Sequence, residues 1–405
     1  MNVRRSAAAL AAAVALGAAA APAAQAADAK PSPSAALPSG LYGTADPKFD
    51  GVFRQSYALL AQDSAGVRPA GKAVDWLTGQ QCTSGGFAAY RADASEPCGS
   101  KTPVDSNSTA AAVQALAALG GERGTVDKGV AWLKSVQNQD GGWGYNPGLP
   151  SDANSTGIVV GALAAAGEKP AAVKSQQGKS PYDALTKLAL DCGENGGAFG
   201  LADAKSGTLT PNADATAAGV LGGLGKGMLV DPPKKTGSAP KCAPADSAGQ
   251  AAANGTGYLL KQLAESGHLT SSMPGSEDKP DVGNTADAVV ALAAAGQSKQ
   301  AKKSAVWLSE NSAAWAKQSG PAAYSQLILA AHAAGLDPRD FGGTDLVKQL
   351  NATGPAPQAT EAAKDEKKKD DDDGGVSVWW IVGVGLVAGV GIGFLLSGRN
   401  KKTQL

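Results

Sequence analysis

The clearest pattern along the chain is a set of four apolar segments that begin with polar side chains and end at glycine. Aligned on a shared threonine, each has Asp or Asn four positions earlier and Gly eleven positions later. An oxygen-bearing side chain at the start and glycine at the end are typical of a short helix. A helix that is apolar all round is enclosed by protein. We therefore predict inner helices around Thr109, Thr156, Thr216 and Thr285.

Amphipathic segments alternate with these apolar ones. They carry Lys, Gln and Glu on one side and Trp-Leu or Tyr-Leu on the other, which predicts outer helices at residues 71–81, 128–139, 182–191, 257–266 and 302–312. Two weaker apolar copies, 51–66 and 320–335, keep the final Gly but lack the polar start, as terminal copies of a repeat array often do. The pattern predicts an all-α array of about six helix pairs, with no alternation long enough for a sheet.

A further motif recurs beside the outer segments. Residues 128–143 contain Lys-Gly, Trp132-Leu133, Gln137, Gly141 and Trp143, residues 72–87 repeat this order, and 192–200 and 302–315 are partial copies. The motif resembles the QW repeat of the squalene cyclase and protein prenyltransferase superfamily. The resemblance implies an α/α toroid, two concentric rings of helices. In such a toroid the Gln and the aromatic residue stabilise contacts between outer helices and take no part in chemistry.

The ends of the chain differ from its body. Residues 1–26 have a basic start, a short apolar run and a small-x-small exit, as in a secretory signal peptide. Residues 27–40 are a flexible Pro- and Ser-rich lead-in, and the toroid domain is assigned to residues 41–351. Residues 352–375 have blocks of like charge and no apolar periodicity, which predicts a disordered stalk.

A membrane anchor follows the stalk. Residues 376–397 carry no charge and are long enough for one C-terminal transmembrane helix across about 30 Å of hydrocarbon. The basic tail, 398–405, is expected to be cytoplasmic. We therefore expect a single-pass cell-membrane protein whose bulk is extracellular. Gly385, Gly389 and Gly393 form a small-residue stripe, which suggests self-association or packing against a membrane-protein partner such as a transporter subunit.

The four cysteines suggest disulfide bonds, since an exported protein with an even number of cysteines usually pairs them. Three pairings are possible, and we predict the local one, Cys82 with Cys98 and Cys192 with Cys242. Cys192 to Asn195 reads C-G-E-N and looks like the C-G-E-Q thioester motif of complement-type proteins. Asn is too short to close the same ring, which favours the disulfide.

The enzymes of the superfamily use residues that this chain places poorly. The D-x-D-D acid of its terpene cyclases is matched only by Asp370–Asp373, within the predicted stalk. Its prenyltransferases bind zinc through Asp, Cys and His, whereas His268 and His332 suit hydrogen-bonded or surface roles. Lys plus Arg and Asp plus Glu each total 36, which leaves no basic footprint for nucleic acid. We predict no cofactor and no metal, and we favour a non-enzymatic function.

The polar residues at the starts of the inner helices are the candidate ligand-binding site. In a toroid they would surround one mouth of the central cavity, together with Trp143 and Tyr145. The structural alternative is that they are N-caps, each stabilising its helix by about 1 kcal/mol. D-x-N-x-T also resembles the start of a calcium loop, but the later Gly and Glu are missing. The rim residues are Asp105, Asn107, Thr109, Asp152, Asn154, Thr156, Asn212, Asp214, Thr216, Asp281, Asn284 and Thr285.

These features favour a membrane-anchored toroid that binds a small ligand or a partner protein without chemistry. In binding a ligand on a toroid without catalysis, the chain would be similar to the exported cobalamin carriers. These hold their ligand at a toroid rim beneath a second β-domain. A corrinoid would here need a partner to complete its site. The alternatives are an isoprenoid cyclase or prenyltransferase-like enzyme, favoured by acids and aromatic rings inside the cavity, and a structural envelope protein, favoured by a filled cavity.

Overall fold

The computed structural model describes residues 38–359, except 204, 235 and 272–278. The description therefore concerns the unit that begins at residue 38, and that unit alone. The predicted signal peptide, transmembrane helix and cytoplasmic tail lie outside the described residues, as do most of the lead-in and stalk, Asp370–Asp373 and the glycine stripe. Among the helices described, none is long and apolar enough to cross a membrane.

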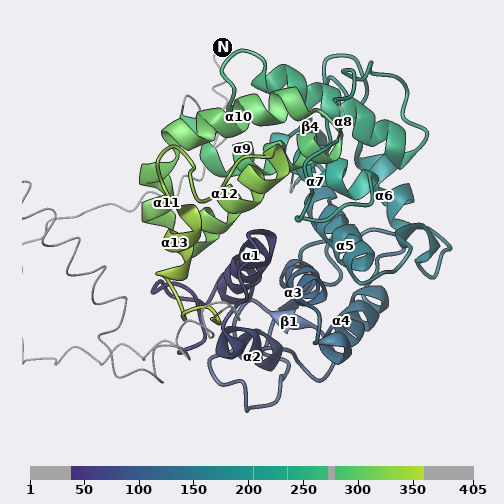
Figure 1. Cartoon of the computed structure of the whole chain (residues 1–405). Coiled ribbons are helices and arrows are strands. Elements are labelled where there is room, and N and C mark those ends of the chain that lie inside the picture. Colours follow the sequence, from purple (N-terminus) through teal and green to yellow (C-terminus); the bar gives the residue numbers. More distant parts are fainter. Residues whose placement is uncertain (1–37, 204, 235, 272–278, 360–405) are drawn as a thin grey trace, which may run out of the picture. The chain divides into compact units, whose positions relative to one another are not determined.

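The apolar segments form the inner ring of an α/α toroid (Figure 1). Each inner helix contacts the next one in the series, and the last contacts the first, so the ring is closed. This arrangement confirms the predicted all-α toroid for the described part of the chain, including both weaker terminal copies. Its members are α1 (Gly51–Ser64), α3 (Ser106–Leu119), α5 (Ala153–Ala165), α7 (Ala213–Gly223), α9 (Val282–Ala294) and α12 (Pro321–Ala334).

The amphipathic segments form the outer layer, and each of the five predicted segments overlaps a helix, with boundaries that differ by up to nine residues. They are α2 (Gly71–Gly79), α4 (Arg123–Ser135), α6 (Pro181–Leu188), α8 (Ala248–Leu263) and α10 (Ser298–Asn311). The last inner helix is covered instead by the short helices α11 (Ala313–Ser319) and α13 (Leu346–Asn351), which do not follow the repeat pattern. A 3-10 turn, η1 (Pro170–Ala172), precedes α6.

Three short antiparallel hairpins lead into inner helices, whereas the sequence predicts no sheet. They pair β1 (Phe87–Ala88) with β2 (Val104–Asp105), β3 (Gly200–Ala202) with β4 (Leu209–Pro211), and β5 (Leu269–Thr270) with β6 (Pro280–Asp281). Strands of two or three residues are too short to produce a visible alternation of apolar and polar positions. Two hairpins end at the N-cap residues of α3 and α9, Asp105 and Asp281, and the third ends at Pro211, one residue before Asn212, the N-cap of α7.

The two ends of the described domain lie against each other. The backbone N–H of Gly43 donates to Thr353 O at 2.8 Å, and the Gln62 amide donates to Asn351 Oδ1 at 2.6 Å. Residues 352–358, predicted to begin the disordered stalk, instead pack on the body, where the Gln358 N–H donates to Arg68 O at 2.9 Å. The stalk prediction was wrong for these residues, because their backbone groups find partners that like-charge patterning cannot reveal.

Candidate functional site

The polar residue that opens each repeat-type inner helix is an N-cap. Asp105 Oδ1 accepts a hydrogen bond from the backbone N–H of Ser108 at 2.6 Å, and Asp152, Asn212 and Asp281 cap α5, α7 and α9 in the same way. Burial raises the pKa of Asp105 to about 6, and the bonds from Ser108 lower it only in part. Their first role is therefore to satisfy free N–H groups at the helix ends.

The shared threonine fastens the preceding loop to its inner helix. Thr156 Oγ1 accepts from the backbone N–H of Trp143 at 3.1 Å and donates to the carbonyl of the same residue at 3.2 Å. Its side chain is fully buried. The equivalent N–H bonds are 2.8 to 3.0 Å long and join Thr109 to Phe87, Thr216 to Phe199 and Thr285 to Leu269.

Trp143 also serves this joint, because its indole N–H donates to Leu133 O at 2.8 Å and its ring is buried. Tyr145, two residues later, is 44% exposed. The structure thus places Thr109, Thr156 and Trp143 within the packed joints between loop and helix, away from any surface that a ligand could contact. Their pattern in the sequence is explained by folding.

A different position, two residues before the threonine, brings polar side chains of neighbouring inner helices together. The Asn154 amide on α5 donates to both carboxylate oxygens of Asp214 on α7, at 3.2 and 3.3 Å. Asn107 on α3 is nine-tenths buried, and its Nδ2 lies 3.5 Å from Asn154 Oδ1. The Oδ1 atom of Asn107 has no hydrogen-bond partner. These three rim residues form a polar row across α3, α5 and α7.

Asn154 and Asp214 of this row line a cavity of about 90 Å³ at the centre of the ring, to which all of the inner helices named above contribute. Its walls share a register in part. The position two after the shared threonine faces inward on α5, α7 and α9, the position two before it on α5 and α7, and the position five after it on α3, α7 and α9. Apolar side chains form most of the wall, including Leu221, Val290 and Leu329. At about 30 Å³ for each water in the liquid, the cavity has room for about three water molecules.

Asp287 occupies one of these inward positions and was missed by the sequence analysis. It lies two residues after Thr285, where α5 and α7 have Ile158 and Ala218. Gln326 on α12 donates to both of its carboxylate oxygens, at 3.2 and 3.3 Å. The signal was present in the sequence, since Asp287 is the one charged residue inside the otherwise apolar segment 286–296.

The carboxyl groups of the cavity influence one another. Burial and then the charge of Asp214 raise the pKa of Asp287 to about 7, while the bond from Gln326 opposes this. Burial, with the charges of Asp281 and Asp152, raises the pKa of Asp214. Tyr57 of α1 also lines the cavity, and burial together with the charges of Asp287 and Asp214 raises its pKa well above the usual range.

A loop after α7 covers the end of the cavity near the carboxyl ends of α3 and α5. Gln114 Oε1 accepts from the backbone N–H of Met228 at 2.8 Å, and its amide donates to Ile158 O at 3.0 Å. A Cβ on Gly161 would lie 2.7 Å from the Cα of Gly227, so loop and helix are in close backbone contact. Gln114 therefore holds the loop in place while its side chain lines the cavity.

A second hollow, of about 250 Å³, lies where α7, α8 and α9 approach one another. Asp281 and Asn284 line it, and the Asn284 amide donates to Asp281 Oδ2 at 2.7 Å. Asp214 lines both this hollow and the central cavity, so the two adjoin. His268 also lines it, with its ring 4.3 Å from that of Trp307.

The QW-like motif joins neighbouring outer elements. The Gln81 amide donates to Gly85 O at 2.9 Å and to Thr125 O on α4 at 2.8 Å, and Gln137 donates to Gly141 O at 2.7 Å. Both glycines have φ of +96°. A Cβ on either would approach the backbone of the next outer element to 2.2–2.3 Å. The motif is structural, as the resemblance implied.

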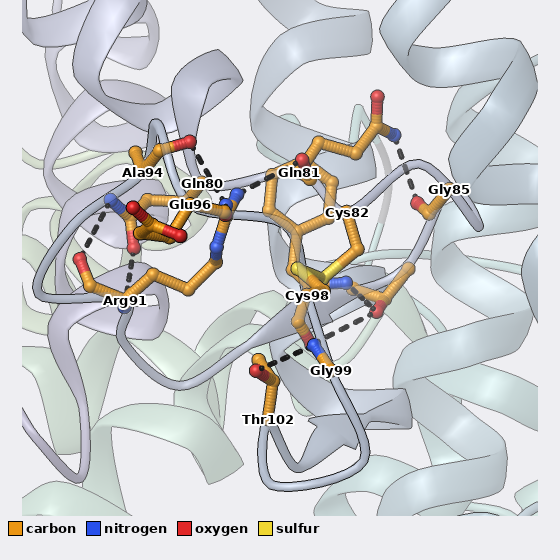
Figure 2. Close-up of a disulfide and its surroundings, with 12 residues drawn as sticks. Gln80, Gln81, Cys82, Gly85, Arg91, Ala94, Glu96, Cys98, Gly99 and Thr102 are labelled. Atoms are coloured by element: carbon orange, nitrogen blue, oxygen red, sulfur yellow. Dashed lines mark hydrogen bonds between the residues drawn. A yellow bond between two sulfur atoms is a disulfide. The ribbon is translucent and has the colours of Figure 1, made fainter.

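Both predicted disulfide bonds are present, Cys82–Cys98 and Cys192–Cys242, with Cα–Cα distances of 5.6 and 5.7 Å. All four cysteines are thereby paired, and Cys192 has no sulfur free for a thioester. Figure 2 shows Cys82–Cys98 beside Arg91, whose guanidinium donates to the carbonyls of Ala94 and Glu96. Disulfides persist in oxidising compartments, which agrees with export.

The described residues offer no group of three or more His, Cys, Asp or Glu side chains that could hold a metal. His332 Nε2 lies 3.3 Å from Asp231 Oδ1, far in sequence from the cavity acids. His268 Nδ1 is 2.9 Å from Leu269 O. Both histidines therefore have ordinary hydrogen-bond partners.

Comparison with known proteins gives distant likeness only. No protein-family model and no curated protein sequence matches the chain. A solved protein from Actinoplanes is 15% identical, with a TM-score of 0.46 over 73% of this chain and 94% of that one. The ent-copalyl diphosphate synthase from Streptomyces platensis is 15% identical, with a TM-score of 0.44 over 70% of this chain and 50% of the synthase. The toroid is established by the helix contacts of this chain itself.

Proposed function

We propose that this chain is a cell-surface, membrane-anchored α/α toroid that captures a small ligand without chemistry. The observation that carries the proposal is the central cavity of about 90 Å³, which every inner helix lines and which combines an apolar wall with a few convergent polar groups. Binding pockets for small molecules have this composition. Asn154 and Asp214 connect the cavity to the row of polar residues at the helix starts.

An isoprenoid cyclase-like enzyme is the second candidate, since acids and aromatic rings do lie inside the cavity. Asp287 is there, and the rings of Phe53 and Tyr57 have centroids 4.9 Å apart. The cavity is nevertheless several times smaller than the roughly 300–1,000 Å³ of sites that enclose drug-sized ligands. A diphosphate would also meet carboxylates beside Asp214, where like charges repel. Capture of a smaller molecule fits this lining better.

The remaining alternatives fit less well. A purely structural protein would be expected to fill its centre with side chains, because interiors are normally close-packed. A corrinoid is too large for the cavity and would have to lie on the rim, where a partner protein would complete its site. The rim residues would then contribute only those polar groups that helix capping leaves free.

The membrane arrangement forms part of the proposal. Disulfides support an oxidising location, and residues 376–397 have the length and composition of a membrane span. Carbonate extraction of host membranes should leave the full chain in the membrane fraction, whereas a chain truncated after residue 375 should be released. Gly389→Leu should weaken association in membranes if the glycine stripe packs against a partner, and unchanged association would remove that idea.

Native mass spectrometry of the full chain, purified from its own host, tests ligand capture. We expect a mass increment from a small molecule that disappears on unfolding. Ala218 lines the cavity, so Ala218→Leu should fill it and abolish the increment. Ala314→Leu, on an exposed face of α11, is the matched control and should retain the increment. A wild-type chain at the mass of the polypeptide alone would contradict the proposal.

A further inference from the structure

The carboxyl groups of the central cavity lack a cationic partner. None of the ion pairs between described residues includes Asp214 or Asp287. Lys226 is the basic residue in the lining, but it is exposed and pairs with neither of them. Enclosed carboxylates without a counter-charge are costly, because hydration is lost and nothing replaces it. A positive charge placed between them would offset that cost.

The neighbouring polar groups leave room for such a charge. The amides of Asn154 and Gln326 each donate to one carboxylate, which leaves the other lone pairs of Asp214 and Asp287 available. The hydroxyl of Tyr57 lines the same space, and no hydrogen bond from it to a described residue is present. Asn107, nine-tenths buried beside Asn154 but outside the cavity wall, also has an amide oxygen without a hydrogen-bond partner. The unsatisfied groups are thus predominantly acceptors.

The apolar part of the cavity wall determines the shape and polarity of the uncharged part of the ligand. Ile158, Leu221, Val290 and Leu329 present branched aliphatic surface, and the adjoining ring of Phe53 adds an aromatic edge. A compact branched apolar group would displace the few waters for which the cavity has room. A zwitterion or a diphosphate would add a negative charge beside carboxylates, which costs free energy.

We propose that the central cavity selects a small organic cation, a primary ammonium on a branched apolar body, with its charged head between Asp214, Asp287 and the Tyr57 hydroxyl. The inference rests on the proposed capture function and names its ligand class. The ammonium donates to the two carboxylates, which come from α7 and α9, and the aliphatic body lies against α5 and α12. Binding involves no covalent step.

Protonation of the cavity acids should then control binding. The charged and polar groups that act on Asp287 are Asp214 on α7, Tyr57 on α1, Gln326 on α12 and Asp281 at the start of α9, and the exposed Lys226 lies in the same lining. The pKa of Asp287 is about 7, so the carboxylate forms as pH rises through neutrality. A cation binds the ionised form, so its affinity should rise about 10-fold between about pH 6 and pH 8.

Three probes with one body separate charge from shape: 3-methylbutylamine, 3-methylbutan-1-ol and 3-methylbutanoate. Their binding is measured calorimetrically on the full chain in lipid nanodiscs, with empty nanodiscs as the blank. We expect the amine to bind at least about 10-fold more tightly than the alcohol, and the carboxylate to bind most weakly. Equal affinity for amine and alcohol, or binding of none of the probes, would overturn the inference.

Matched variants test which carboxylate binds the amine. Asp287→Asn keeps the shape and removes the charge, so it should weaken amine binding about 10-fold and leave alcohol binding within about 2-fold. Asp75→Asn, on the exposed face of α2, should change neither. An amine affinity that Asp287→Asn and Asp214→Asn both leave unchanged would place the cation elsewhere and refute the assignment.

The chemical class of the ligand from the host tests the cation assignment, whereas its presence or absence tests ligand capture. A neutral or anionic small molecule found by native mass spectrometry would overturn the cation assignment and leave ligand capture standing. A chain that carries no small molecule from its host would count against capture itself. An amine of the host that is released by Asp287→Asn would support both.

Discussion

The side-chain amide of Gln326 donates to both carboxylate oxygens of Asp287, at 3.2 and 3.3 Å, and so joins α12 to α9 inside the ring. The bond favours the ionised carboxylate and partly opposes burial, which raises the pKa of Asp287 to about 7. The two residues come from different copies of the repeat, and only one of those copies has the Asp/Thr start.

Removal of this amide should raise the pKa of Asp287. We expect Gln326→Leu to increase it by about 1, since a hydrogen bond to a charged group contributes about 1.5–3 kcal/mol and part of that will be replaced by water. The measurement is a carbon-13 NMR titration of labelled aspartate side chains. Gln349→Leu, on an exposed part of α13, should leave the titration unchanged. A lower pKa in Gln326→Leu would show that the amide does not act on the carboxylate.

The raised pKa of Asp287 makes stability depend on pH. A carboxyl whose folded pKa lies above its unfolded value of 3.8 contributes stability that is complete below about pH 4 and is lost as pH rises through about 7. Asp287→Asn cannot ionise, so its stability advantage over the wild type should grow by about 2–3 kcal/mol from about pH 5 to pH 8. Urea unfolding at both pH values measures this difference. A constant difference would mean that Asp287 titrates normally.

The joint between loop and inner helix should be sensitive to loss of one hydroxyl. Thr156→Val has nearly the same shape but leaves the buried N–H of Trp143 without its acceptor, which should cost about 1–3 kcal/mol. Thr186→Val, whose hydroxyl bonds only to Tyr182 O on a partly exposed helix, should stay within about 0.5 kcal/mol of the wild type. Thermal unfolding followed by circular dichroism compares the two variants. Equal losses of stability would show that the shared threonine has no special role.

The glycine of the QW-like turn is required by space and backbone angle. A Cβ on Gly141 would lie 2.2 Å from Ser180 O, and its φ of +96° is unfavourable for other residues. We expect Gly141→Ala to destabilise the fold by at least about 2 kcal/mol in urea unfolding. In Gly249→Ala the added Cβ on α8 meets nothing within 4 Å, and this control should stabilise the chain by about 0.5–1 kcal/mol.

The two disulfides should contribute unequally. Their sequence separations are 16 and 50 residues, so loop-closure entropy suggests about 3 kcal/mol for Cys82–Cys98 and about 4 kcal/mol for Cys192–Cys242. Paired Cys→Ser variants, unfolded in urea, should show this order. The reverse order would indicate that contacts in the folded loops outweigh the entropy of the unfolded chain.

Much of the architecture follows from the sequence because it depends on local chemistry. Asp152, Thr156 and Gly167 mark one inner helix by a cap, a bond back to the loop and a positive-φ end. The same residue spacing recurs in three other copies, although the positive-φ glycine after α7 is Gly225 and not Gly227. The local cysteine pairing was also predictable. Residues 352–358 were not, since their partners Gly43 and Arg68 lie about 300 residues earlier in the chain.

The candidate binding site in the central cavity depends on tertiary structure. Which face of an all-apolar helix points to the ring axis is not encoded in its own hydrophobic pattern, because every face is buried. Only ring closure separates the capping Asp152 from Asn154, two residues later, which lines the cavity. Only the packing of α9 against α12 brings Asp287 and Gln326 together. The sequence determined the helices and their order. The cavity and its unpaired acids arise from contacts between helices distant in the chain.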